Sequence, residues 1–138
     1  MRRILFSPSA LIALILLVGL GAVRAVAPEV SGTWDLYWGT RPNISTVTVT
    51  LHQAGMALTG TATIPPETME DGVHTTEVPI MGGSVAGDHV LFQFEEMTKA
   101  GLKTLAFHGT VAADTLEGYV AGVATNPSEE VPFDGIRR

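Results

Sequence analysis

The sequence predicts an all-β protein: an eight-stranded antiparallel up-and-down barrel, preceded by an N-terminal signal-peptide helix. Beyond an apolar leader, the chain consists of short segments rich in Val, Thr, Ile and Phe. These segments are separated by Gly, Pro, Asp and Asn, and no stretch has a helical period. Closure is expected because an open sheet of eight strands would leave two exposed edges, whereas about eight strands can form a narrow barrel. The expected strands are residues 32–38, 44–53, 57–64, 75–81, 84–96, 102–112, 115–124 and 129–137.

Residues 1–25 have the three parts of a secretory signal. Basic Met1-Arg2-Arg3 precedes an apolar run from Ala10 to Val23, and the small residue Ala25 lies at the preferred cleavage point. Cleavage after Ala27 is an alternative. An uncleaved anchor is another, although about fourteen apolar residues fall short of the ~20 that a spanning helix needs. We therefore expect a secreted or periplasmic protein with no stable membrane insertion after cleavage.

The remaining residues, 26–138, are enough for a single barrel domain with one core. The whole chain has eight basic and fourteen acidic residues; without the three arginines of the leader, five basic residues remain and the net charge becomes −9. Such a charge would repel a phosphate backbone, so nucleic acid is not an expected partner. The chain has no cysteine, which excludes disulfides, thiol catalysis and thiolate metal sites.

The segment 44–53 has the clearest strand pattern, because Val47, Val49 and Leu51 alternate with threonines and a histidine. One face of this strand is expected to be buried and the other to be in water. Several later strands repeat the alternation, and we expect their apolar faces to line or fill the barrel interior. A ligand held there would contact Leu36, Trp38, Val49, Leu58, Phe92, Phe94, Glu96, Phe107 and Tyr119.

Short connections with turn residues predict antiparallel hairpins between successive strands. They are Gln53–Met56, Ala86–Asp88, Lys99–Gly101 and Ala113–Asp114, and the stretch from Pro65 to His74 is the one sizeable loop. Glycines also recur inside the strands. They indicate sharp coiling, where a side chain would collide across a narrow barrel, although simple turn composition is an alternative interpretation.

The start and the end of the expected domain carry a resemblance to a known group of barrels. Gly32-Thr33-Trp34 resembles the Gly-x-Trp opening of lipocalin and avidin barrels, the calycin group, and the chain ends in Gly135-Ile136-Arg137-Arg138. The Gly-Thr-Trp start, followed by Leu-Thr-Gly-Thr, also resembles uncharacterised domains of exported bacterial proteins. No tryptophan follows Trp38, so the biotin pocket of avidins is not part of the resemblance.

This resemblance implies roles for three residues in barrel closure. Trp34 would plug one end of the barrel, Arg137 or Arg138 would lie over its ring, and Gly32 would let the entering chain pass close beneath. The first strand would pair with the last. The alternative is that Trp34 is an ordinary core residue of a β-sandwich.

No catalytic motif is found in the sequence, and no catalytic residue, cofactor or metal site is expected. His52 and His108 fall on the expected outer faces of their strands. The acidic loop from Glu67 to His74 matches no EF-hand spacing, so a solvated loop is the favoured interpretation. Glu96 shares a face with Phe92 and Phe94; inside an apolar barrel its carboxyl could act as an acid or base, whereas at the rim it would be solvated.

The favoured function is that of an exported, non-catalytic barrel that takes a small apolar or amphipathic molecule into its open end. One alternative is a barrel enzyme of the cyclase or isomerase type that uses Glu96 as its acid. Another is a protein-interaction scaffold. The sequence leaves open the identity of the ligand, the oligomeric state, and whether the interior is hollow or filled.

Overall fold

The computed structural model describes residues 29–65, 75–98, 101–123, 126 and 128–138. The predicted signal peptide, residues 1–25, and the acidic loop from Glu67 to His74 lie outside these described residues. The described strands are β1 (Gly32–Thr40), β2 (Asn43–Ala54), β3 (Ala57–Ile64), β4 (Thr76–Pro79), β5 (Met81–Ala86), β6 (His89–Thr98), β7 (Gly101–Ala112), β8 (Thr115–Ala121) and β9 (Glu130–Arg137). Within the described part of the chain, no helix is long and apolar enough to cross a membrane.

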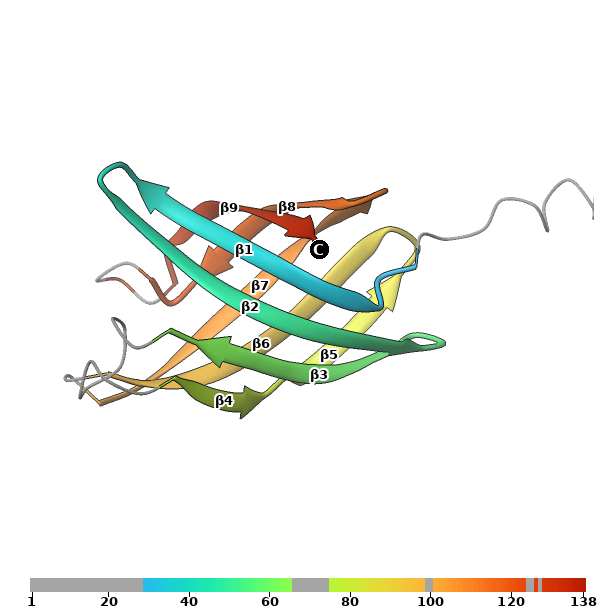
Figure 1. Ribbon diagram of the computed structural model, residues 1–138, viewed down its shortest axis with the longest axis horizontal. Coiled ribbons are helices and arrows are strands. Elements are labelled where there is room, and N and C mark those ends of the chain that lie inside the picture. Colours follow the sequence, from blue (N-terminus) through green and yellow to red (C-terminus); the bar gives the residue numbers. More distant parts are fainter. Residues whose placement is uncertain (1–28, 66–74, 99–100, 124–125, 127) are drawn as a thin grey trace, which may run out of the picture.

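Eight of these strands close into an antiparallel barrel, which confirms the predicted fold class. The ring runs β1-β2-β3-β5-β6-β7-β8-β9 and returns to β1. Closure is made by the first and last strands, which pair from Trp34 opposite Arg137 to Trp38 opposite Phe133. Figure 1 shows β1 and β2 in front and β6 and β7 behind, on opposite sides of the enclosed core. The extra strand, β4, pairs with β3 at the edge of the ring.

The region from residue 75 to residue 96 differs from the expected two strands. The expected strand 84–96 is divided into β5 and β6 by a turn at Gly87-Asp88, where Gly87 adopts a left-handed φ of 65°. The expected break at Gly82-Gly83 is instead an irregularity inside β5, where the pairing with β6 shifts between Met81 and Ser84. A bulge bends a strand. Here the segment before it, β4, pairs only with β3, and the chain pairs with β6 only from Met81 onward.

The interior contains a cluster of aromatic rings from four strands, surrounded by aliphatic side chains. Phe107 lies at the centre, with ring centroids 5.0 Å from Phe92, 5.5 Å from Phe94, 5.1 Å from Phe133 and 5.6 Å from Trp38. All five side chains are buried. No polar or charged side chain is fully buried among the described residues. The core therefore depends on apolar burial and ring packing.

The strand glycines allow neighbouring strands to approach closely. A Cβ atom on Gly60 would lie 1.9 Å from the carbonyl oxygen of Thr50, and one on Gly118 would lie 2.0 Å from that of His108. The predicted collision is thus with the backbone of the adjacent strand, and the prediction of a collision across the barrel was wrong. The glycines are needed where the sheet coils tightly.

One end of the barrel, here called the tryptophan end, is sealed by Trp34. Its indole N–H donates to the carbonyl oxygen of Val30 at 2.9 Å, and the guanidinium carbon of Arg137 lies 4.5 Å from the ring centroid. Arg137 also donates to Asp114 at 3.0 Å and to the backbone carbonyl groups of Glu29, Ser31 and Ala113. Arg138 instead pairs with Asp35 at 3.0 Å. Arg137 therefore joins the first strand, the last strand and the β7–β8 turn.

Gly32 lies directly beside the Arg137 side chain. A Cβ atom at Gly32 would be 3.2 Å from a guanidinium nitrogen of Arg137, and the glycine φ of 137° is one that other residues rarely adopt. This position therefore favours glycine for both space and backbone conformation.

Candidate functional site

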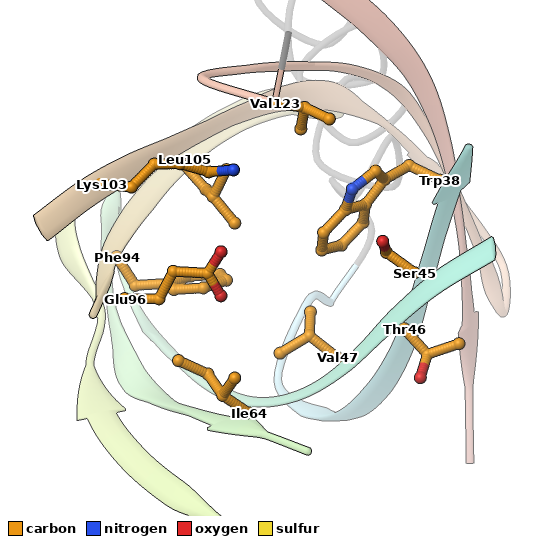
Figure 2. Close-up of a pocket in the computed structure, with 10 residues that line it drawn as sticks. All are labelled: Trp38, Ser45, Thr46, Val47, Ile64, Phe94, Glu96, Lys103, Leu105 and Val123. Atoms are coloured by element: carbon orange, nitrogen blue, oxygen red, sulfur yellow. The ribbon is translucent and has the colours of Figure 1, made fainter. Parts of the chain in front are cut away.

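The candidate site is a small cavity at the other end of the barrel, here called the cavity end, where β1, β3, β6 and β8 finish. Its volume is about 70 Å³. It is lined by residues of β1, β2, β3, β6 and β7, and by Val123 after β8 (Figure 2): Trp38, Ser45, Thr46, Val47, Ile64, Phe94, Glu96, Lys103, Leu105 and Val123.

The strand period places Glu96 in this cavity. Val90, Phe92 and Phe94 alternate with exposed or half-buried residues along β6, and Glu96 continues their inward row. Figure 2 shows the Glu96 carboxylate pointing into the space between Phe94 and Trp38. An ionisable group is thus presented to an interior that is otherwise almost entirely apolar.

Lys103 is the direct cross-strand partner of Glu96 in the β6–β7 hairpin. The two side chains are half-buried, but no ion pair or hydrogen bond joins the Glu96 carboxylate to any residue that the structure describes. Burial raises the pKa of the Glu96 carboxyl, and the positive charge of Lys103 opposes this by lowering it. The carboxyl therefore keeps its capacity to accept a hydrogen bond from a ligand, or to donate one when protonated.

The opposite wall adds an aromatic ring and a hydroxyl. Trp38 and Ser45 face each other in the β1–β2 pair, and Ser45 belongs to the same inward row as Val47 and Val49. Trp38 and Ser45 therefore add an aromatic ring and a hydroxyl group to the cavity wall opposite Glu96.

The cavity is small compared with ordinary ligand sites. Pockets for drug-sized molecules are on the order of 300–1,000 Å³, whereas this one is about 70 Å³. It has room for a few water molecules or for the head group of a larger molecule. The rest of the interior is filled by side chains.

The predicted interior residues divide into three groups. Trp38, Phe94 and Glu96 line the cavity. A second group is buried in the core away from the cavity: Leu36, Val49, Leu58, Phe92 and Phe107. The predicted interior position of Tyr119 was wrong, because its side chain is 50% exposed while Leu116 and Val120 point inward. Gly118 lies between those two inward residues and contributes no side chain to the pattern.

Several lining residues were not predicted as site residues: Ser45, Thr46, Val47, Ile64, Lys103, Leu105 and Val123. A signal for Lys103 existed in the sequence, because a turn at residues 99–101 places Lys103 opposite Glu96. Leu105 lies in the same β6–β7 hairpin, opposite Phe94. The other residues come from segments more distant from Glu96 in the sequence, and only the closed ring brings them to it.

Neither of the two histidines predicted on outer faces belongs to a cluster of potential metal ligands among the described residues. His52 and His108 are exposed, as their strand positions predict, and the Nε2 atom of His108 lies 2.7 Å from Glu130. No group of three or more potential metal ligands occurs in the described part of the chain. The acidic loop residues from Glu67 to His74 lie outside that part.

Taken together, the fold and the cavity define a small closed antiparallel β-barrel with an extra strand, a buried aromatic cluster and a half-buried carboxyl at one end. No family model, curated protein or solved structure matches the chain. Its resemblance to calycins therefore depends on the Gly-Thr-Trp segment and on the arginine over Trp34.

Proposed function

We propose that this barrel binds a small amphipathic molecule at its cavity end, with the polar head of that molecule beside Glu96. One observation carries the proposal: a half-buried carboxyl with no partner among the described residues points into an apolar cavity. Leaving a polar group partly desolvated and unpaired costs free energy. A ligand that supplies the missing hydrogen bond would recover part of that cost.

An ammonium head fits this cavity better than a carboxylate. Glu96 offers a negative oxygen and Trp38 offers an aromatic ring, and both attract a cation. The net charge of the whole chain is −6, which also favours the approach of a cation over that of an anion. Lys103 also lines the cavity and disfavours a cation there, but no ion pair joins it to Glu96 and its side chain is half-buried.

Two features that do not involve the cavity also support this proposal. They are the resemblance to calycins and the apolar leader. Closed barrels of about eight strands can hold one small ligand, and a barrel exported through residues 1–25 would meet its ligand outside the cytoplasm. A relationship to calycins and the export of the chain are themselves parts of what we propose.

Three probes with one chain length and different heads test the function: octylamine, octanol and octanoate. Calorimetric titration should give the tightest binding for octylamine and the weakest for octanoate. Glu96→Gln should weaken octylamine binding about tenfold or more, because a hydrogen bond to a charged group contributes roughly 1.5–3 kcal/mol. Glu117→Gln is the matched control, since Glu117 is exposed on β8. Equal binding of all three probes, or an equal loss in both variants, would contradict the proposal.

The same carboxyl also favours a second candidate function, that of an acid–base enzyme. Burial raises the pKa of Glu96, which moves a carboxyl toward the range in which it can transfer protons near neutral pH. Mass and NMR spectra of a bound molecule before and after long incubation separate the two candidates. A binding protein returns the molecule unchanged, whereas an enzyme converts it at a rate that Glu96→Gln abolishes.

A further inference from the structure

Two opposite charges line the cavity without pairing with each other. Glu96 and Lys103 are directly opposite in the β6–β7 pair, and both belong to the inward rows of their strands. Figure 2 shows both side chains among those that surround the cavity. No ion pair or hydrogen bond joins the Lys103 ammonium group to any described residue. The cavity therefore presents one acidic and one basic group, and each keeps its capacity to bind a ligand.

The neighbouring carboxyl, Glu95, takes no part in this arrangement. It lines an apolar groove of about 200 Å³ on the outside of the barrel, between β4 and β6, here called the outer groove. The buried Ile64 borders both spaces and separates them. Among the described residues that line the cavity, only Glu96 and Lys103 are charged.

A ligand with a single charge is attracted by one of these groups and repelled by the other. An ammonium head gains from Glu96 and loses to Lys103, and a carboxylate head has the reverse balance. Because both side chains are half-buried, water screens these interactions less than it does at an open surface. A head that carries both charges gains from both groups, with its ammonium group beside Glu96 and its anionic group beside Lys103.

The dimensions of the site favour a compact head. Opposite residues on antiparallel strands have Cβ atoms roughly 4.5–5.5 Å apart, and the cavity has a volume of only about 70 Å³. An ammonium and a carboxylate on one carbon atom form the most compact head with both charges. Ser45, which also lines the cavity, offers a hydroxyl group that can donate to the carboxylate or accept from the ammonium group.

We infer that the cavity binds an α-ammonium carboxylate head, with the ammonium group beside Glu96 and the carboxylate beside Lys103. This inference rests on the proposed function and names its ligand class more closely, as an amino acid with an apolar side chain. The same head occurs on serine phospholipids, so a free amino acid and a lipid are two sources of one chemistry.

Three probes of matched shape test the inference by calorimetric titration at neutral pH. In 2-aminooctanoate both charges are present, in octan-2-amine a methyl group replaces the carboxylate, and in 2-methyloctanoate a methyl group replaces the ammonium group. The probe with both charges should bind about tenfold or more tightly than either analogue, because each charge-assisted hydrogen bond that it adds is among the stronger ones.

Lys103→Met gives a change of opposite sign for two of the probes. It should weaken 2-aminooctanoate binding about tenfold and strengthen octan-2-amine binding, since it removes an attraction in the first case and a repulsion in the second. Retained octan-2-amine binding also shows that the variant is folded. Arg41→Met is the matched control, because Arg41 is exposed in the turn between β1 and β2 and does not line the cavity.

The outcomes separate the inference from the proposed function. Octan-2-amine binding that depends on Glu96, with no advantage for 2-aminooctanoate, would overturn the inference and leave the proposed function intact. An equal loss of 2-aminooctanoate binding in Lys103→Met and Arg41→Met would also overturn it, because the effect would then come from the net charge. If no probe binds, both ideas fail.

Sedimentation with vesicles distinguishes the two sources of the head. Phosphatidylserine vesicles carry the α-ammonium carboxylate, and phosphatidylcholine vesicles, which lack the carboxylate, are the control. We expect no sedimentation with either, because the net charge of −6 opposes approach to an anionic surface. Sedimentation with phosphatidylserine that Lys103→Met abolishes would assign the head to a lipid and overturn the assignment to a free amino acid.

Discussion

At the scale of single residues, the alternation of side chains along β6 gives Glu95 and Glu96 different surroundings. Adjacent residues in a strand point to opposite faces, so Glu96 lies in the cavity and Glu95 in the outer groove. Burial disfavours the ionised form of Glu96 and raises its pKa, while Lys103 lowers it. The Glu96 carboxyl thus lies where its contact with water is reduced.

The raised pKa of Glu96 predicts a pH dependence of stability. The folded protein binds the Glu96 proton more tightly than the unfolded chain, so the resulting stabilisation is complete below the ordinary pKa of 4.5 and is lost as pH rises through the raised value. Glu96→Gln should therefore gain stability relative to the natural protein across this window. Urea unfolding between pH 4 and pH 8 measures the difference.

A direct titration provides the control for this pH dependence. In a carbon-detected NMR titration, the Glu96 carboxyl midpoint should lie above 4.5 and should rise further in Lys103→Met, because Lys103 lowers it in the natural protein. A midpoint at or below 4.5 would refute the burial of this group in solution.

At the scale of elements, hairpins bring backbones together at paired glycines. Gly109 and Gly118 are opposite each other in the β7–β8 pair. A Cβ atom on Gly118 would lie 2.0 Å from the His108 carbonyl oxygen and 2.5 Å from the Gly109 Cα atom. Neither obstacle is a flexible side chain, so a methyl group here requires the strands to separate.

Gly118→Ala should therefore destabilise the barrel by about 3 kcal/mol or more, near the upper end of overpacking costs. Gly55→Ala is the matched control. Gly55 has a φ of +65° in the β2–β3 turn, but nothing lies within 4 Å of an added Cβ atom, so its cost should be only the backbone penalty of about 1 kcal/mol. Urea unfolding compares the two variants, and equal losses would contradict close strand approach at Gly118.

At the scale of the whole molecule, stability depends on closing the ring between β1 and β9. Arg137 reinforces this closure, because it covers Trp34 and donates hydrogen bonds to the entering chain and to the β7–β8 turn. Arg138 is adjacent in sequence but makes its contacts with Asp35 and Thr48 on the outer face. Two neighbouring arginines thus have very different structural roles.

Arg137→Met should lower the free energy of unfolding by about 3 kcal/mol, since it removes a cation–π contact and several charge-assisted hydrogen bonds. Arg138→Met, the matched control, should cost less than about 1 kcal/mol because the Arg138 side chain is 59% exposed. Chemical unfolding followed by tryptophan fluorescence measures both losses. Similar values for the two variants would contradict a special role of Arg137 in closure.

The sequence predicted those features that depend on local periodicity. Alternation within β2 and β6 identified the buried faces, and turn residues located most of the hairpins. The prediction failed for Tyr119, where Gly118 leaves the inward row of β8 without a side chain and obscures the period. It also failed near Gly82 and Gly83, because a glycine pair can equally begin a turn or form a bulge.

By itself, the sequence determined that the chain forms an all-β fold and that Glu96 shares a face with Phe92 and Phe94, since both follow from the two-residue period of a strand. Only the tertiary structure decided that Trp38 and Ile64 meet Glu96 around a small cavity, and that an apolar groove lies between β4 and β6. The physical reason is that these contacts join strands far apart in the chain. They depend on register, ring closure and a bulge, which local patterns do not specify.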